Sequence, residues 1–426
     1  MSEARGRAAP RIEVPRRHDV MDCGATLLIH RRPGAAVTAV RVHVRGGPGL
    51  DAEGKDGTAY LVGSLAEQGT DRHTDEEIAS RLEPEGGGVH GDALGLSGAI
   101  AGPAWRELVD VLGELTTSAS YPEDRVGRQL DRLKTRLAAE AEDPRAQSGI
   151  RFKSLIYGED HFLGRNPYGT HETVSRITPQ DLRTHREDHW CGARMIVSIA
   201  GDVDPDEVHE HADRAFRDVP LGTPHERTKR AFPPIEARRS TFERDRQQVH
   251  VHLGHLGVER RNPDYAALTV MDHVLGTGPG FTNRITRSLR DELGLAYSVH
   301  ADIHGTAGLH PGMFRAYIGT SPENVCTAVD GFVSEMRRIQ DEPVPEDELA
   351  VAKSYLVGSF AMGFERAARR ASYLVNAEVH GFPDDHLEQL PARFAAVTPE
   401  DVQRAAQAHL YPDACSISVA GPPVDL

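Results

Sequence analysis

The spacing of apolar and polar residues predicts a mixture of strands and helices in the opening part of the chain. Residues 24–30 and 36–44 are rich in β-branched side chains and partly alternate, which predicts two strands joined by an Arg-Arg-Pro-Gly turn. Residues 105–118 have apolar positions at helical spacing. Residues 122–142 form a long, highly charged helical stretch that stops at an Asp-Pro pair.

One stretch, 57–70, follows the two strands and reads as a helix that ends in a Gly turn. Positions 60, 63 and 64 share one face of that helix, because residues three and four apart are neighbours on a helix. His, Glu and His at these positions would build a metal or acid/base site. The residues present are Tyr60, Gly63 and Ser64, so the helix carries no such chemistry.

An internal repeat organises the whole chain. The Thr-Pro-x-Asp of 178–181 recurs at 398–401, followed in each copy by a His and an Ala-Gly pair, and every matched position lies 220 residues further on. Each copy reads as a capped helix followed by a strand. A shared motif with unchanged spacing indicates two homologous units in one chain.

The repeat predicts an α+β protein with two duplicated domains, 12–222 and 236–426, joined by a Pro- and Arg-rich linker at 223–235. Each domain is expected to have a mainly antiparallel sheet with helices on one side. A chain of 426 residues is also too long for one ordinary core, which agrees with two domains.

Charge and cysteine usage narrow the class of protein. The net charge of −15 argues against a nucleic-acid partner, which needs a basic surface. The four cysteines lie far apart with no CxxC pair, so we expect no zinc site built from cysteines. Cysteines that are so few and unpatterned are typical of a protein in a reducing compartment. Residues 1–14 lack the apolar run of a signal peptide, and no run reaches the roughly 18 residues of a membrane span. We therefore expect a cytoplasmic protein.

The order of several segments resembles the insulinase-like (pitrilysin-type) zinc metallopeptidases, which include the mitochondrial processing peptidase and its bacterial two-subunit relatives. Their active subunits carry Gly-Leu-Ala-His-x-x-Glu-His followed by Gly-Thr, and 57–70 has that frame. The loop 166–169, the strand 197–202 and the segment 283–297 also look like that family. The resemblance covers 15–422 and implies that the two domains form half of a clamshell, which a second chain would close into a chamber.

This chain departs from the family at every catalytic position. The resemblance implies that Tyr60 replaces the first His, that Gly63 replaces the Glu base and that Ser64 replaces the second His. The third zinc ligand, a Glu about seventy residues on, would fall in the helix at 132–137, where no acid is present and Thr135 is the likeliest equivalent. A catalytic zinc needs three protein ligands, so we expect no metal and no cofactor in this chain, and zinc in a partner subunit.

The second half keeps a different feature of the family. Arg290 and Tyr297 stand seven residues apart and resemble an Arg/Tyr pair that binds the substrate backbone near the zinc site. In two-subunit members, the pair on one chain completes the zinc site of the other. The resemblance therefore implies a non-catalytic, substrate-binding subunit of a heterodimeric zinc peptidase that acts on peptides. The alternative is a structural or binding subunit, like the core subunits of a respiratory complex, with no peptidase activity in the assembly.

Several groups of histidines could bind a metal ion, but each is a weaker hypothesis than the family resemblance. His185, Asp188 and His189 imitate a zinc helix, but the repeat copy keeps only the last of them, as His409. A metal enzyme built on that group is a third option. Three further histidines share or flank a strand: His250, His252 and His255. His300 and His304 are weaker candidates still. The Gly-rich 276–280 lacks the Lys-Ser/Thr of a phosphate loop and reads as a tight turn.

Overall fold

The computed structural model describes residues 13–226, 231–278 and 283–424. The central residues of the expected linker, part of the Gly-rich turn and the N-terminal tail up to residue 12 lie outside these ranges. Within the described residues, two sheets are present, one in each half of the chain. No helix among them is both long enough and apolar enough to cross a bilayer.

The first half contains a sheet of six strands in the order β1–β2–β6–β3–β5–β4, in which only β2 and β6 pair in parallel. Its strands are β1 (Arg17–Val20), β2 (Thr26–Arg31), β3 (Val37–Val44), β4 (Gly88–Asp92), β5 (Gly95–Ala101) and β6 (Met195–Gly201). Its helices are α1 (Thr58–Ala66), α2 (Asp75–Leu82), α3 (Trp105–Ser118), α4 (Glu123–Glu142), α5 (Pro144–Tyr157), α6 (His171–Val174), α7 (Pro179–His189) and α8 (Pro205–Ala215).

The second half has a sheet of five strands in the order β7–β11–β8–β10–β9, in which only β7 and β11 are parallel. The strands are β7 (Arg239–Glu243), β8 (Val249–Leu256), β9 (Val299–Asp302), β10 (Met313–Thr320) and β11 (Ser416–Gly421). The helices are α9 (Tyr265–Asp272), α10 (Val325–Asp341), α11 (Glu346–Phe364), α12 (Ala367–His380), α13 (His386–Ala396) and α14 (Pro399–His409), with π-helical segments η6 (His273–Thr277) and η7 (Thr286–Glu292).

The repeat seen in the sequence is a repeat of structure. Thr178 caps α7 in a capping box with Asp181, and Thr398 caps α14 in the same way with Asp401. Each of these helices leads into the strand that pairs in parallel with the first or second strand of its half. The predicted fold class, a duplicated α+β chain with mainly antiparallel sheets, is thereby confirmed.

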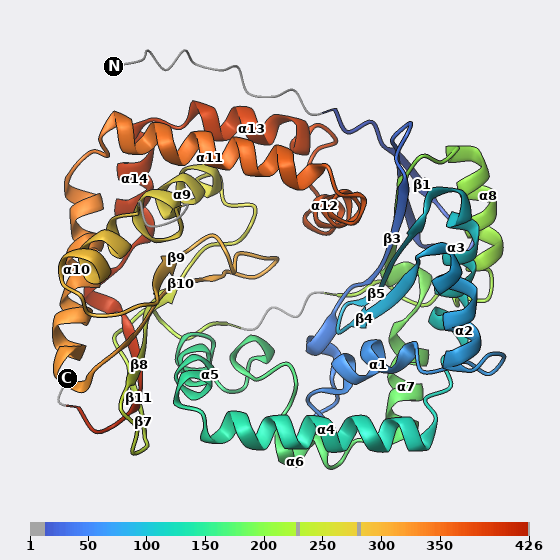
Figure 1. Cartoon of the computed structure of the whole chain (residues 1–426), viewed down its shortest axis with the longest axis horizontal. Helices are drawn as coiled ribbons and strands as arrows, with labels where there is room; N and C mark the ends of the chain where they lie inside the picture. Colours follow the sequence, from blue (N-terminus) through green and yellow to red (C-terminus); the bar gives the residue numbers. More distant parts are fainter. Residues whose placement is uncertain (1–12, 227–230, 279–282, 425–426) are drawn as a thin grey trace.

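The two halves exchange one helix each. Helix α12 of the second half contacts β3 and β6 of the first sheet, and α5 of the first half contacts β8 and β11 of the second (Figure 1). Polar contacts fix both: Arg370 on α12 lies 2.6 Å from His30, and Ser148 on α5 lies 2.9 Å from His252. Helices on one side of each sheet were expected; the structure shows that the other half supplies a helix to the second face.

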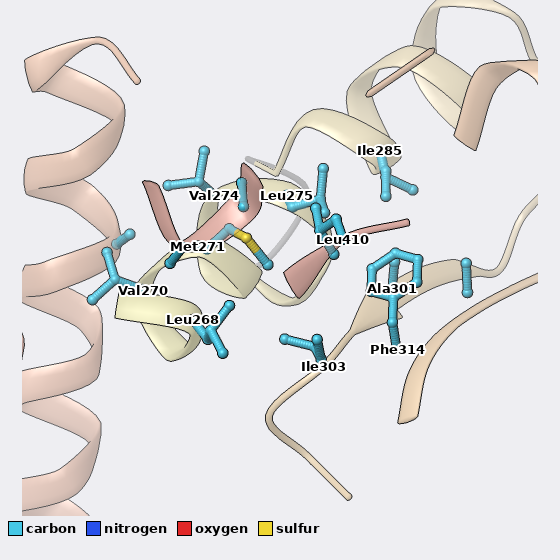
Figure 2. Close-up of a cluster of buried hydrophobic side chains, with 14 of the residues drawn as sticks. Leu268, Val270, Met271, Val274, Leu275, Ile285, Ala301, Ile303, Phe314 and Leu410 are labelled. Carbon is cyan, nitrogen blue, oxygen red and sulfur yellow. The ribbon is translucent and has the colours of Figure 1, made fainter. Parts of the chain in front are cut away.

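Each half has its own large apolar core. In the second half, side chains from α9, η6, β9 and β10 interdigitate (Figure 2). Among those drawn are Leu268, Met271, Leu275, Phe314 and Ile303. The first-half core gathers β2, β3, β6, α1 and α3 around residues such as Leu61 and Leu112, which are wholly buried. Burial on this scale is the dominant favourable contribution to folding.

We predict that acid weakens the fold below neutral pH. Burial lowers the pKa of His255 to about 4, and burial together with neighbouring arginines lowers that of His43 to about 4. Between about pH 6.5 and 4 the unfolded chain binds protons that the folded chain does not, so the free energy of unfolding falls as the pH falls, by up to about 1.4 kcal/mol per pH unit for each histidine. Urea unfolding at pH 7.5, 6 and 5 measures this, and His43→Gln should show a shallower dependence. A slope that His43→Gln leaves unchanged would contradict the assignment to this residue.

Candidate functional site

Helix α1, which carries the motif positions, is held at its start by a distant carboxylate. Gly57 precedes the helix with φ +103° and provides no side-chain cap. Asp51 takes that role, accepting hydrogen bonds from the backbone N–H of Gly57 at 2.8 Å and of Ala59 at 2.7 Å. Burial raises the pKa of Asp51 to about 6, even though these N–H groups act in the opposite direction. The loop before the helix thus satisfies the free N–H groups of its first turn.

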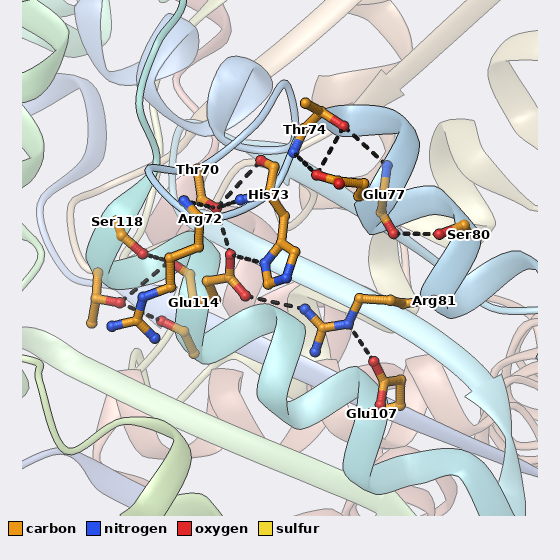
Figure 3. A network of polar contacts seen from close by, with 12 residues as sticks. Thr70, Arg72, His73, Thr74, Glu77, Ser80, Arg81, Glu107, Glu114 and Ser118 are labelled. Atoms are coloured by element: carbon orange, nitrogen blue, oxygen red, sulfur yellow. Dashed lines mark hydrogen bonds and ion pairs between the residues drawn. The ribbon is translucent and has the colours of Figure 1, made fainter.

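The turn after α1 is tied to α3 by a polar network around Glu114 (Figure 3). His73 Nδ1 lies 2.8 Å from Glu114 Oε1, Arg81 donates to Glu114 Oε2 at 3.1 Å, and the Thr70 hydroxyl donates to Glu114 as well. Burial would raise the pKa of Glu114, but these donors outweigh it and lower the pKa below its ordinary value. Both ends of α1 are therefore fixed.

The middle of α1 lies directly on the edge strand β4. A Cβ at Gly63 would stand 1.9 Å from the Asp92 carbonyl oxygen, and a Cβ at Gly91 would stand 1.9 Å from the Gly63 carbonyl oxygen. Real Cβ atoms do not approach this closely, so neither position accepts a side chain unless the helix moves away from the strand. The position at which the resemblance implies a Glu base therefore has no room for one.

Around Tyr60 the structure places aromatic rings and a cation. The Tyr60 ring packs edge-on against Tyr168, with centroids 4.8 Å apart. The guanidinium of Arg136 on α4 lies 3.8 Å from the Tyr168 ring centroid and donates to Glu140 at 2.8 Å. A cation and aromatic faces suit one another, whereas a guanidinium beside the position of a metal repels it.

Two of the predicted motif positions stay apart from this cluster. Thr135 is exposed, and its hydroxyl donates to the Asp131 carbonyl of its own helix at 2.9 Å. Ser64 is half-buried, and its hydroxyl is 3.5 Å from the Leu61 carbonyl. The structure therefore brings Arg136, and not Thr135, to the Tyr168 ring that packs on Tyr60. Sequence reasoning missed Arg136 by one position on the helix, and the Tyr168 loop was noted only as part of the family resemblance.

The other expected pair, Arg290 and Tyr297, is brought together. Arg290 is on the π-helical segment η7, and its guanidinium lies 5.0 Å from the centroid of the Tyr297 ring. Tyr297 is 86% exposed, while the Arg290 side chain is 22% exposed. The exposed phenol can donate a hydrogen bond to a peptide carbonyl, and the guanidinium beside it, which also lies 3.9 Å from Asp291, carries further donors.

The histidine groups weighed from the sequence are engaged in separate contacts. The rings of His185 and His189 touch, 4.6 Å apart, but Arg194 lies 3.0 Å from His189 Nδ1, which disfavours a cation there. On β8, His250 Nδ1 contacts the Tyr317 hydroxyl and His252 Nδ1 contacts Ser148. Both ring nitrogens of His255 are used, by the Leu256 carbonyl and the Tyr411 N–H. No three of these histidines converge on one point among the described residues.

A cavity of about 1070 Å³ lies between the two halves of the chain. Its wall comes from β3, the loop that follows α5, the hairpin before β10 and helix α12. The lining mixes histidines, arginines and acids with aromatic rings, among them His43, Arg45, Glu159, Phe162 and His310. Polar and aromatic groups therefore share the wall of this cavity.

Comparison with known proteins places these observations in a family. Residues 176–356 match the family model described as the Peptidase M16 inactive domain. An uncharacterized zinc protease of Streptomyces coelicolor is 28% identical over 324 residues, covering 74% of this chain and 68% of the relative. A crystal structure of a peptidase M16 inactive domain from Pseudomonas fluorescens superposes with a TM-score of 0.90 at 21% identity, covering 96% of this chain and 98% of that one. A chain of complex III2 from Candida albicans, with Inz-5 bound, has a TM-score of 0.76 at 16% identity and covers 95% of each chain.

These findings confirm the resemblance to the insulinase-like zinc peptidases, and the fold is that of M16-like peptidases. The matched model describes an inactive domain and covers 176–356, a range that does not include Tyr60, Gly63 or Ser64. The fold is therefore M16-like, and the match to an inactive domain favours a non-catalytic role.

We predict that Gly63→Ala destabilises the protein by about 2–4 kcal/mol, because the added methyl group collides with the β4 backbone. The matched control is Gly127→Ala in the interior of α4, where a Cβ meets nothing within 4 Å. That change should stabilise by up to about 1 kcal/mol, since Ala is the better helix former. Urea unfolding of the three proteins measures both effects, and equal stabilities for the two variants would contradict the close contact.

Proposed function

We propose that this chain is the substrate-binding, non-catalytic subunit of a heterodimeric M16 zinc metallopeptidase. A partner chain would carry His-x-x-Glu-His and the zinc ion, and this chain would complete the partner's site. One observation carries the proposal: Arg290 lies over the ring of a Tyr297 that is 86% exposed. This places a phenol that another molecule can reach beside a guanidinium, which is the arrangement that the resemblance implies for binding a substrate backbone.

The chemistry of the pair suits peptide hydrolysis at a metal held by another chain. Hydrolysis turns the scissile carbonyl into a tetrahedral oxyanion. The Arg290 guanidinium and the Tyr297 phenol are both donors, and each strengthens its hydrogen bond as negative charge develops on that oxygen. The partner's zinc would activate the attacking water, so this chain needs no metal at Tyr60.

Two further features support a peptide as the substrate. The cavity of about 1070 Å³ offers mixed polar and aromatic walls, which suit an extended peptide. Half of a clamshell leaves a concave face open, and a second chain that covers it would limit substrates to peptides or small unfolded polypeptides. We place the pair in the cytoplasm, where the four free cysteines, three of them buried, stay reduced.

A structural role is the second candidate, and one observation favours it. The chain shares its fold with a chain of complex III2 at a TM-score of 0.76. In that case this chain would stabilise a larger assembly, and no associated chain would carry an intact zinc motif. Purification of the tagged chain from its own organism, followed by mass spectrometry of the stoichiometric partner, separates the two candidates. A partner with His-x-x-Glu-His supports the peptidase, and a partner without it supports the structural role.

We predict that the isolated chain has no peptidase activity and that the reconstituted pair has. Arg290→Ala combined with Tyr297→Phe should lower kcat/KM of the pair by about 100-fold, because two oxyanion donors are lost. A fluorogenic peptide library measures the activity.

The matched control is Arg287→Ala, which removes a more exposed arginine from the same π-helical segment and should leave kcat/KM within about twofold. Analytical ultracentrifugation checks that each variant still assembles. Peptidase activity in the isolated chain, or full activity of the pair with the double variant, would overturn the proposal.

A further inference from the structure

A buried polar cluster lies in the second half, away from Tyr60, and it includes His304, one of the histidines considered from the sequence. Asp272 is the last residue of α9, Asp302 is the last residue of β9, and His304 follows two positions later. Each offers one ligand atom, and the three atoms lie within 4.8 Å of one another. Among the described residues, no other set of three histidine, cysteine or acidic side chains comes so close.

Asp272 is the centre of the cluster and is wholly buried. Its Oδ2 accepts hydrogen bonds from the backbone N–H groups of Ile303 and His304, both at 2.8 Å, and lies 2.5 Å from His304 Nδ1. Its Oδ1 has no hydrogen-bond partner in the described part of the chain. A buried carboxylate oxygen without a partner is costly, so this atom is the one in the cluster that most needs a ligand.

The other two members are oriented by neighbours in the way that metal ligands are. Asp302 is 3% exposed, and its two oxygens accept from Arg315 Nε at 2.9 Å and from the Gly305 N–H at 3.0 Å. Outer contacts of this kind fix a carboxylate and leave its second lone pairs available. The His304 side chain remains 21% exposed, which gives a path from solvent to the cluster.

The helix that carries Asp272 corresponds to α1 of the first half. Gly63 lets α1 approach the edge strand β4, and Gly276 lets η6 approach the edge strand β9, where a Cβ would stand 2.4 Å from the Ala301 carbonyl oxygen. Three residues before each glycine stand Tyr60 and His273. The His273 and His304 ring centroids are 5.9 Å apart, so a second imidazole borders the cluster.

We propose that Asp272, Asp302 and His304 bind a divalent transition-metal ion. Two carboxylates and one imidazole suit Zn²⁺ or Mn²⁺, while Mg²⁺ and Ca²⁺ prefer oxygen ligands alone. The unpartnered Asp272 Oδ1 binds the ion together with one oxygen of Asp302 and one ring nitrogen of His304, and any proton on that nitrogen passes to solvent. The ion holds the end of α9 to the hairpin after β9. This site is separate from the peptidase chemistry proposed above and gives this chain no peptidase activity.

Calorimetric titration of the full chain with ZnCl₂ and with MnCl₂, after treatment with a chelator, tests the site. We expect one high-affinity ion per chain, and a melting temperature that rises with the concentration of the ion that binds. Asp302→Asn and His304→Ala should each weaken binding by roughly 100-fold or more, since each removes one ligand. Circular dichroism shows whether these variants fold. If His304→Ala does not fold, the affinity of Asp302→Asn, which keeps the shape of the side chain, is the deciding measurement.

The matched control uses a second His–Asp pair of the same half. His409 Nε2 lies 2.9 Å from Asp264 Oδ2, outside the cluster, and His409→Ala should leave the affinity unchanged. A wild-type chain that binds neither ion at about 1 mM, or Asp302→Asn and His304→Ala variants with wild-type affinity, would overturn the proposal and leave an ordinary buried ion pair. These measurements need no partner chain and no activity, so their failure is distinguishable from failure of the proposed function.

Discussion

The contact between Gly63 on α1 and Gly91 on β4 sets what the first half can do. Gly63 lies against the Asp92 carbonyl, and Gly91 lies against the Gly63 carbonyl. Because neither glycine has a Cβ, the helix and the edge strand come closer than any side chain would allow. Asp51 fixes the start of the helix and the Glu114 network fixes the turn after it, so the helix cannot withdraw cheaply. At the position where the resemblance implies a catalytic base, the close contact therefore leaves no space for any side chain larger than that of glycine.

The exchange of helices makes the two halves one structural unit. Helix α12 covers the second face of the first sheet, and α5 covers the second face of the other, so neither half retains a complete sandwich without its partner. The polar contacts across the exchange, Arg370 with His30 and Ser148 with His252, are partly or wholly buried. Groups at the seam, including the wall of the central cavity, are thus positioned by both halves at once.

The features that could be predicted from the sequence depend on short-range contacts or on the internal repeat. The capping boxes at Thr178 and Thr398 are short-range hydrogen bonds, and both formed as the spacing indicated. The pairing of Arg290 with Tyr297 was available only through the family resemblance, because no local rule brings them together. The approach of Arg136 to Tyr168, and the packing of Gly63 on Asp92, depend on tertiary contacts between distant segments. Asp272 did leave a signal, since an acid stood alone in the apolar run that ends α9, but burial alone does not reveal what it contacts.

The two corresponding helices of the halves, α1 and α9, differ in the side chains that they place at the edge strand. In the first half, the glycine-anchored helix packs Tyr60 edge-on against Tyr168, and Arg136 lies over the Tyr168 ring. In the second half, the corresponding helix ends in a wholly buried Asp272. A buried carboxylate with an unpartnered oxygen lowers the stability of the folded chain, and a well-packed apolar residue at that position would stabilise it more. Its presence at a helix end that turns π-helical therefore argues for a purpose beyond packing, because such irregularities concentrate where a protein binds something.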